Sequence, residues 1–566
     1  MTDWRFYGRA KEIANLRNGL EFDTVPSTRR FHALKVRGRR GVGKTELLEY
    51  LSRRAPPETT FVLYELPDPA TEGTPVAAVV QGLIVAARQA GLTNKNAMPA
   101  QQDWPNAYLW FKAYVLGLLQ IGAVVVLDEF HLARDWGLDS YVKQIIDEAS
   151  GGRGQWGKLY PGKLVLMGSH QQRIDEMFRA DKPLYGRTGT TVNVRPWCLK
   201  TIMTMAAEQG VLATPGRFLT LWTAYDGMPR NWQRYCTGPD YRHLHEIKDD
   251  TEWRKAWLEV EYRIVTADQR ERWDTKAWIE LPPDQRELLV WIGHNRPKGM
   301  ELNKVPKELG SHDKKLAIMN HLRTWLDLVD LNRPLGEQSP AKWYITDPNT
   351  LFQINVFREM VHIKDDQPAV SVTGTMLKKR EDKRHLTRME TLEGGALELL
   401  AGAWLAAKEG VTWTSTRAWH PDFDGDIDAI ATSMGDGPKI VWLGSCKRSE
   451  RSHSPDNARN EQDRFMECLL ASAGREKEES AELLKNAELK RLLFSPTFSP
   501  EFHEAFGQEG FTTIDIPAMA RSFNLEHAPH QEAHQIKSDH EARPPVPDKD
   551  VVLKKQKNSA PPRTGI

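Results

Sequence analysis

The sequence predicts an α/β protein whose N-terminal part is a parallel sheet covered by helices. Short apolar segments alternate with segments of helical spacing along residues 1–199, which is typical of such a sheet. A glycine-rich turn follows the first apolar segment and precedes a helical one, as in phosphate-binding loops. The predicted strands are Ala33–Arg37, Phe61–Glu65, Ala123–Leu127, Lys163–Met167 and Thr190–Val194.

Length and composition indicate a multidomain protein. At roughly 150 residues per domain, 566 residues correspond to three or four domains. The net charge of +1 excludes a polycation, so any nucleic-acid contact must come from local patches. The four cysteines form no CxxC pair, and we find neither an apolar signal segment nor a membrane-length apolar run. We therefore expect a cytoplasmic protein without membrane contact.

The patterning after residue 199 predicts further units. Residues 200–275 have helical spacing without strands and are predicted to form a lid. Residues 276–355 predict a winged helix, with three helices and a strand pair. A basic linker at 356–389 and a second α/β unit at 390–520, ordered helix, strand, strand, helices, strand, come next. The polar, proline-containing segment 521–566 is predicted to be disordered. In the winged helix the predicted elements are helices Glu287–Gly293, Leu302–Leu309 and His312–Asp330 and the strand Trp343–Thr346.

The glycine-rich turn has the GxxxxGK[ST] pattern of a P-loop. Its residues are Gly38, Arg39, Arg40, Gly41, Val42, Gly43, Lys44 and Thr45, followed by the predicted helix Glu46–Ser52. Glycines let the backbone amides face the phosphates, and the helix N-terminus adds positive potential. We expect Lys44 to contact the β- and γ-phosphates of ATP and the Thr45 hydroxyl to bind Mg²⁺.

Two carboxylates and a serine follow later strands of the same unit. Asp128 and Glu129 end the apolar run that begins at Ala123, at the sheet edge where ligands bind. We expect Asp128 to hold Mg²⁺ through water and Glu129 to polarise the attacking water. Ser169 follows the next strand, where it either senses the γ-phosphate or is simply a polar strand end.

Several motifs resemble the archaeal-type ATPases of the STAND group, relatives of the AAA+ ATPases. They are Phe6-Tyr7-Gly8-Arg9 with Glu12, Leu127-Asp128-Glu129-Phe130, Gly168-Ser169, Pro183-Leu184-Tyr185-Gly186-Arg187, Asp226-Gly227-Met228-Pro229 and Trp343-Tyr344-Ile345-Thr346-Asp347-Pro348. The resemblance implies a five-stranded core, a lid, a winged helix and switch-like use of ATP. It implies that Pro229 packs on adenine. Arg187 either faces the γ-phosphate or forms a structural salt bridge.

Residues 390–516 resemble restriction-endonuclease-like nucleases, a domain that many members of that ATPase family carry. The resemblance implies a metal site in which Glu398 is the helix acid, Asp428 the strand acid and Lys447 the lysine. Ser445 departs from the pattern, which has an acid there. Either Asp426 or Glu398 supplies the missing carboxylate, or the domain has kept the fold and lost the chemistry.

The predicted function is an ATP-hydrolysing switch coupled to a nuclease-like domain that acts on or near DNA. The alternative is a signalling or interaction switch with an inactive C-terminal scaffold. The candidate partners are ATP, DNA, and a second copy of the chain or another protein. The basic residues of the winged helix leave three interpretations: a DNA contact, an intramolecular clamp or a solvated face. They are Lys304, Lys307, Lys314, Lys315 and Arg323.

Overall fold

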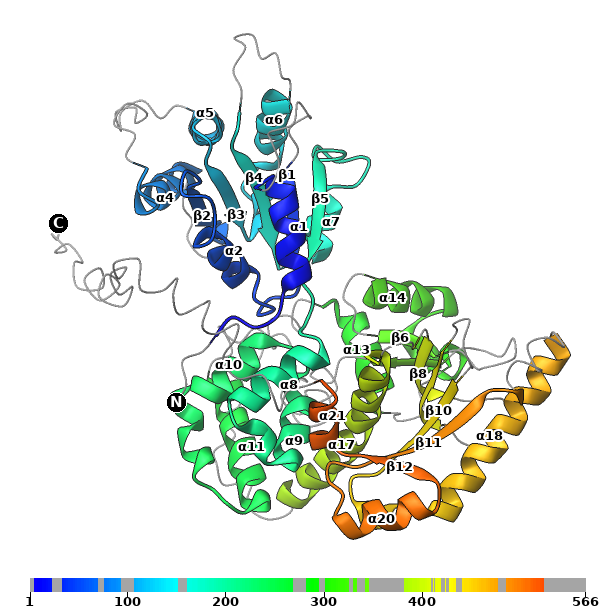
Figure 1. Cartoon of the computed structure of the whole chain (residues 1–566). Coiled ribbons are helices and arrows are strands. Elements are labelled where there is room, and N and C mark those ends of the chain that lie inside the picture. Colours follow the sequence, from blue (N-terminus) through cyan, green and yellow to red (C-terminus); the bar gives the residue numbers. More distant parts are fainter. Residues whose placement is uncertain are drawn as a thin grey trace.

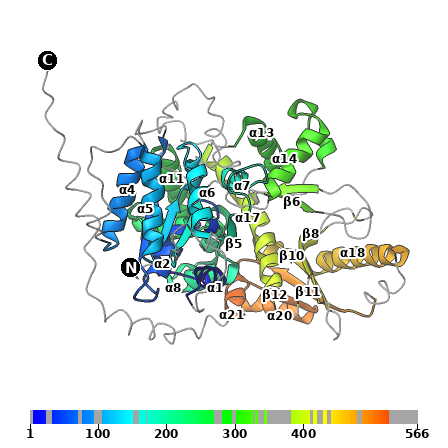
Figure 2. The same cartoon turned by 90° about the horizontal axis from the view of Figure 1, so that it is seen from above.

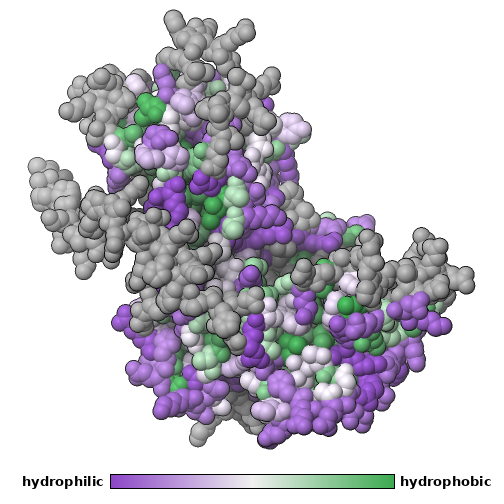
Figure 3. Space-filling model, viewed as in Figure 1, coloured by the Kyte–Doolittle hydropathy of each residue, from purple (hydrophilic) through white to green (hydrophobic). Residues whose placement is uncertain are grey.

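The computed structural model has an N-terminal lobe and a larger second lobe below it (Figure 1). Hydrophilic residues cover most of the described surface on the face shown in Figure 3. None of the described helices combines the length and the apolar character that a membrane crossing needs. The structure describes residues 5–22, 33–69, 76–92, 106–150, 160–169, 171–267, 281–294, 301–324, 329–332, 342–345, 381–408, 411, 413–418, 423, 427–433, 440–476 and 485–523.

The N-terminal lobe contains the predicted five-stranded parallel sheet. Its strands are β1 (Ala33–Arg37), β2 (Phe61–Glu65), β3 (Val124–Asp128), β4 (Lys163–Gly168) and β5 (Thr188–Asn193), in the order β2-β3-β4-β1-β5. Five predicted boundaries, at both ends of β3 and β5 and at the end of β4, were wrong by one or two residues. Ala123 lies outside β3 because its N–H bonds to Leu118 at the end of the preceding helix. β5 begins at Thr188, which pairs with Ala33.

Helices cover both faces of this sheet, because alternate strand residues point to opposite sides. One core cluster combines β-strand residues such as Val125 and Leu166 with α4 (Val76–Gln89), α5 (Ala107–Gln120) and α6 (Asp139–Ser150). The other combines Val36, Val124 and Val126 with helices α1 (Ala10–Leu20) and α2 (Lys44–Ser52). The short helix α7 (Gln171–Met177) follows β4.

The segment predicted as a lid is helical throughout its described part. It contains α8 (Leu199–Glu208), η2 (Val211–Ala213), α9 (Pro215–Tyr225), α10 (Pro229–Thr237), η3 (Pro239–His245) and α11 (Asp250–Ala267), where η denotes a 3-10 helix. Large aromatic side chains fill its interior. Among the largest buried side chains are Trp232, Trp253, Trp257, Tyr225 and Tyr241.

The next unit differs from its prediction in several places, since its first helix begins at Pro283 and not at Glu287, and its last strand begins at Lys342 and not at Trp343. It contains α13 (Pro283–His294), η4 (Leu302–Lys304), η5 (Lys307–Leu309), α14 (His312–Thr324) and the antiparallel strands β6 (Val329–Asn332) and β7 (Lys342–Ile345). The helix predicted at Leu302–Leu309 is instead two short turns, since Pro306 between them has no N–H to donate. The helix predicted to reach Asp330 ends earlier, because Val329 pairs with Ile345 in the hairpin.

The C-terminal unit is a five-stranded mixed sheet between helices. Its elements are α17 (Glu381–Ala406), β8 (Trp413–Ala418), β9 (Ile427–Thr432), β10 (Ile440–Cys446), η6 (Glu450–Ser452), α18 (Pro455–Glu476), β11 (Glu488–Phe494), α20 (Pro500–Gln508), β12 (Phe511–Ile514) and α21 (Ile516–Arg521). The strand order is β12-β11-β10-β9-β8, antiparallel from β8 to β10 and parallel from β10 to β12. The predicted order contains three strands, whereas the described part of this unit has five. The antiparallel strands β8 to β10 form a meander, and β12 adds an edge strand.

Helix α17 begins within the segment predicted as a linker, and one of its turns buries Met389 and Leu392. It lies between the lid helices and the C-terminal sheet in both views (Figures 1 and 2). The predicted start of the tail at residue 521 was wrong, since Arg521 ends helix α21 and Ser522 accepts a hydrogen bond from Trp404, whereas residues 524–566 lie outside the described residues.

A buried carboxylate joins α17 to the lid. The Glu393 side chain is 1% exposed, and its Oε1 accepts a hydrogen bond of 2.6 Å from Thr220 of α9. Arg254 of α11 lies 3.1 Å from the same oxygen, and Arg448, just after β10, lies 3.0 Å from Oε2. A buried carboxylate needs such partners to remain charged. The lid and the C-terminal sheet therefore share one polar anchor as well as one hydrophobic core.

Candidate nucleotide site

The P-loop connects β1 to α2 and needs glycine at two kinds of position. A Cβ on Gly38 would lie 2.3 Å from the carbonyl oxygen of Val194, so no larger residue fits there. Gly41 and Gly43 have φ angles of 73° and 89°, in the left-handed region that favours glycine. This backbone curls around the start of α2, where amide groups can face an anion.

Lys44 is folded onto its own loop. Its ammonium group donates to the carbonyl oxygens of Gly38 and Arg39, at 3.0 and 3.2 Å. Burial lowers the pKa of Lys44, while the nearby Glu129 and Asp128 oppose this shift. A phosphate group would give this buried cation a stronger partner than two carbonyls do.

The hydroxyl of Thr45, in α2, and the carboxylate of Asp128, at the end of β3, form a hydrogen bond. Thr45 Oγ1 donates to Asp128 Oδ2 at 2.9 Å. Burial and the charge of Glu129 raise the pKa of Asp128 to about 6. Among the described residues no group of three or more His, Cys, Asp and Glu is placed to hold a metal. One hydroxyl and one carboxylate nevertheless fit Mg²⁺, which keeps several waters and shares phosphate oxygens.

Glu129 is held by a serine and a histidine. Ser169 Oγ donates to the Glu129 carboxylate, at 2.5 Å from Oε1 and 2.7 Å from Oε2. His131 Nδ1 lies 3.2 Å from Oε2. Burial alone would raise the pKa of Glu129, but the hydrogen bonds from His131 and Ser169 outweigh it and lower the pKa to about 2. The carboxylate is therefore charged at neutral pH, as a residue that polarises water must be.

The structure explains the Phe6-Tyr7-Gly8-Arg9 motif as a brace for the loop. The Arg9 side chain is buried and donates to the carbonyl oxygens of Val42, at 2.6 Å, and of Arg195 before the lid. Arg9 also lies 3.1 Å from Glu12. Phe6 stacks on Tyr50 of α2 with ring centroids 4.2 Å apart. The N-terminal segment thus fixes both the P-loop and the entry to the lid.

Replacing Arg9 should destabilise this lobe. In Arg9→Ala the carbonyls of Val42 and Arg195 lose their partner, and a buried unsatisfied group costs about 1–3 kcal/mol. We expect the melting temperature of the N-terminal lobe to fall by roughly 4–8 °C, measured by calorimetry. The control is Arg5→Ala, because the Arg5 side chain is 58% exposed. Equal melting temperatures for the parent and Arg9→Ala would contradict this role.

The lid closes one side of a cavity of about 490 Å³ above the P-loop. Pro229, Arg230 and Gln233 of α10 line this cavity together with Lys44, Thr45, Asp128, Glu129 and Ser169. The Arg230 backbone N–H lies 3.4 Å from the carbonyl oxygen of Gly41, so the first turn of α10 contacts the loop.

Sequence patterns did not identify all the lining residues. Phe6 and Arg9 were noticed only as a family motif, and Arg230 and Gln233 were missed. His131, which contacts Glu129 but does not line the cavity, was also missed. Arg230 directly follows the proline of the lid motif, and a basic side chain in that position was the available signal.

The predicted residue Arg187 lies elsewhere. Its Nε is 2.7 Å from Asp147 of α6, and Arg187 is not among the residues that line the cavity. A hydrogen bond from Arg187 lowers the pKa of Asp147. This arrangement is the salt bridge that was one of the two alternatives for this residue.

Much of the basic surface predicted for the winged helix has local partners. Lys315 is buried and donates to the carbonyl oxygen of Val305 at 2.9 Å. Lys304 pairs with Glu301, and Lys314 lies 3.0 Å from Asp284. These contacts reduce the number of cations available for a phosphate backbone.

The described residues predicted for the nuclease-like site come from three neighbouring elements, namely α17, β9 and the end of β10. Asp428 Oδ2 accepts a hydrogen bond of 2.6 Å from the Cys446 N–H, and Lys447 is exposed just after β10. Ser445 is buried, and its Oγ lies 3.4 Å from Gln462 of α18. Glu398 belongs to α17, and Asp426 lies outside the described residues.

The comparisons with known proteins find similar solved structures only. No family model matches the sequence, and no curated protein matches it. A Walker-type ATPase of Pyrococcus abyssi, PABY2304, is 17% identical, with 62% of this chain and 96% of that chain covered and a TM-score of 0.41. The ORC2 protein of Aeropyrum pernix, in its ADPNP–ADP complexes, is 15% identical, covering 63% and 94%, with a TM-score of 0.43. Cdc6p of Pyrobaculum aerophilum is 13% identical, covering 64% and 97%, with a TM-score of 0.31.

Proposed function

We propose that this chain binds ATP with Mg²⁺ and hydrolyses it. The observation that supports this best is that one cavity joins the P-loop lysine, the Thr45–Asp128 pair and a charged glutamate. Purified chain with ATP and Mg²⁺ should release phosphate, and EDTA should stop the release. If the chain binds ATP but releases no phosphate, it is a nucleotide sensor and not an ATPase.

The roles within the cavity follow from its chemistry. Lys44 exchanges its carbonyl partners for the β- and γ-phosphates. Mg²⁺, when bound near Thr45 and Asp128, supplies charge neutralisation at the phosphate oxygens. Glu129 orients the attacking water, and Ser169 fixes the carboxylate that does so. Phe6 and Pro229 offer apolar surfaces for the adenine ring.

The raised pKa of Asp128 predicts a pH-dependent metal contribution. Binding of a cation requires ionised Asp128, and this carboxyl is protonated below pH 6. The affinity for Mg²⁺–ATP should therefore fall by about tenfold per pH unit below 6, measured by calorimetry. Asp128→Asn should bind more weakly and should lack this part of the pH dependence. Since ATP itself also titrates, parallel pH profiles of parent and variant would contradict the metal role.

We further propose that ATP closes the lid. Pro229 and Arg230 begin α10 at the edge of the cavity, so a bound nucleotide would contact both the loop and the lid and favour the closed state. Residues 281–345 would then act as a winged-helix clamp, since the lysines described above already have partners within the unit. Slower amide hydrogen exchange in α10 and α14 with ATP than without it tests this proposal.

For the C-terminal domain we propose a nuclease-like fold that does not cleave DNA. Its order of helix, three antiparallel strands, helix and parallel strand suits such a fold. Mg²⁺ exchanges its waters reluctantly and needs negative ligands, whereas Ser445 is neutral and faces α18. The domain then serves as a scaffold that reports or receives the nucleotide state, which is the second of the two functions predicted from the sequence.

This proposal predicts no cleavage of plasmid DNA by the parent chain with Mg²⁺, with or without ATP. The same gel assay on Lys447→Ala gives the background of contaminating nucleases. Ser445→Glu should bind divalent cations more tightly than the parent if one missing ligand explains the inactivity. Nicking by the parent that disappears in both Lys447→Ala and Asp428→Ala would establish an active nuclease instead.

A further inference from the structure

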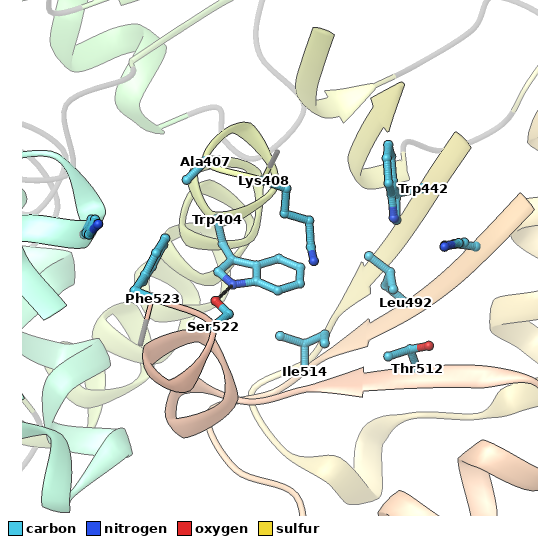
Figure 4. A pocket seen from close by; sticks show the side chains of 11 residues that line it. Trp404, Ala407, Lys408, Trp442, Leu492, Thr512, Ile514, Ser522 and Phe523 are labelled. Carbon is cyan, nitrogen blue, oxygen red and sulfur yellow. Dashed lines mark hydrogen bonds between the residues drawn. The ribbon is translucent and has the colours of Figure 1, made fainter. Parts of the chain in front are cut away.

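A second cavity, of about 720 Å³, is lined by none of the residues that line the nucleotide cavity (Figure 4). Its walls are the end of α17, strands β10 to β12 and the residues after α21, and Lys200 of α8 lines it from the lid side. The volume falls within the range of about 300–1,000 Å³ that is usual for small-molecule sites. The cavity therefore has the size of a ligand site and lies where lid and C-terminal domain meet.

Two tryptophans form the aromatic part of this cavity. Trp404 of α17 and Trp442 of β10 are 3% and 8% exposed. The Trp404 Nε1–H donates to Ser522 Oγ at 2.8 Å, which fixes the indole ring. Leu492 and Ile514 contribute an apolar floor below the rings (Figure 4). Such surfaces suit a flat aromatic ring.

Three lysines provide the charge of the cavity, and none of the described residues that line it is acidic. They are Lys200, Lys408 and Lys490. Lys408 Nζ lies 4.2 Å from the centroid of the Trp404 ring and extends between the two indoles (Figure 4). Lys490 already has an acidic partner that does not line the cavity, since its Nζ lies 3.5 Å from Glu488. Burial and the neighbouring Lys490 lower the pKa of Lys408, so an anion would stabilise its charged form.

We propose that this cavity binds a nucleotide of about the size of a nucleoside monophosphate. The base lies against Trp404 and Trp442 once the Lys408 ammonium moves from the Trp404 ring to the phosphate, and such stacking accepts any base. The phosphate lies at Lys408, with Lys490 and Lys200 near enough to share its charge. Because Lys200 lies in the first turn of α8 and the tryptophans belong to the C-terminal domain, the ligand connects both units.

The test is calorimetry of AMP, GMP, CMP and UMP on the Lys44→Ala chain, which weakens binding at the P-loop. At least one nucleotide should bind with a Kd below about 1 mM. Lys408→Gln and Trp442→Ala should each weaken this binding by tenfold or more. The matched control is Lys255→Ala, an exposed lysine of α11. Inorganic phosphate should bind at least tenfold more weakly than the best nucleotide.

Several results would overturn the proposal. They are the absence of binding by all four nucleotides, binding that Lys408→Gln leaves unchanged, or equal affinity for phosphate alone. Lys408 is half-buried at a helix end, so Lys408→Gln remains informative if Trp442→Ala fails to fold. A decamer of thymidine that binds more than tenfold tighter than TMP, and depends on Lys408, would indicate a single-stranded DNA site instead. Residual binding at the P-loop is recognised because it would not depend on Lys408.

Discussion

Lys44→Ala should lower the affinity for ATP by roughly 100-fold or more. The Lys44 side chain is a buried cation of the cavity, and the carbonyls of Gly38 and Arg39 are the partners it can exchange for phosphates. Alanine leaves the backbone amides of the loop in place but removes the charge. Calorimetric titration of ATP with Mg²⁺ measures the loss.

The matched control for this variant is Lys11→Ala, an exposed lysine of α1 that should bind ATP like the parent. Circular dichroism and the melting temperature must show that Lys44→Ala keeps its fold. An affinity within threefold of the parent would remove the P-loop from the proposed site. A loss of binding together with unfolding would instead reveal a structural role for the two carbonyl hydrogen bonds.

Glu129→Gln should bind ATP normally and hydrolyse it about 100- to 1,000-fold more slowly. Glutamine keeps the shape and can still accept a hydrogen bond from Ser169, but it has no negative charge with which to polarise water. Single-turnover hydrolysis separates this step from product release. The low pKa of Glu129, about 2, also means that its protonation should not reduce turnover between pH 8 and 6.

Glu49→Gln is the control for that variant, because Glu49 lines the same cavity and lies on α2. It should hydrolyse ATP at close to the parent rate. If Glu129→Gln turns over within a factor of two of the parent, the base must be another group. If both variants are equally slow, the effect reflects the overall charge of the cavity.

The local part of the fold and of the site followed from the sequence. The run Val124–Leu127 is buried on both sides and could only be a central strand, and the P-loop pattern fixes its own turn. The brace at Arg9 could not be predicted in the same way. Its hydrogen bonds reach residues 33 and 186 positions away, and no local pattern encodes such distances.

The incorrect predictions also have physical reasons. The segment Leu302–Leu309 has helical spacing, but Pro306 interrupts the hydrogen bonds that a helix needs. The apolar Val329 continued the periodicity of the preceding helix, yet tertiary pairing with Ile345 placed it in a strand. The tryptophan cavity also depends on tertiary structure. Its walls come from separate segments between Lys200 and Phe523, so no local sequence pattern could predict it.

The anchor at Glu393 determines where this molecule can bend. Rotation of the lid away from α17 would strip a buried carboxylate of its partners on α9 and α11, which is costly. Movement of the lid relative to the N-terminal lobe would instead have to occur at residues 194–198, between β5 and α8, and would release the Arg195 carbonyl from Arg9. Movement there would rotate the lid and the C-terminal sheet together, as one rigid body, relative to the P-loop lobe. A small displacement of α10 caused by a bound phosphate would then move the C-terminal end of α18 over a larger distance.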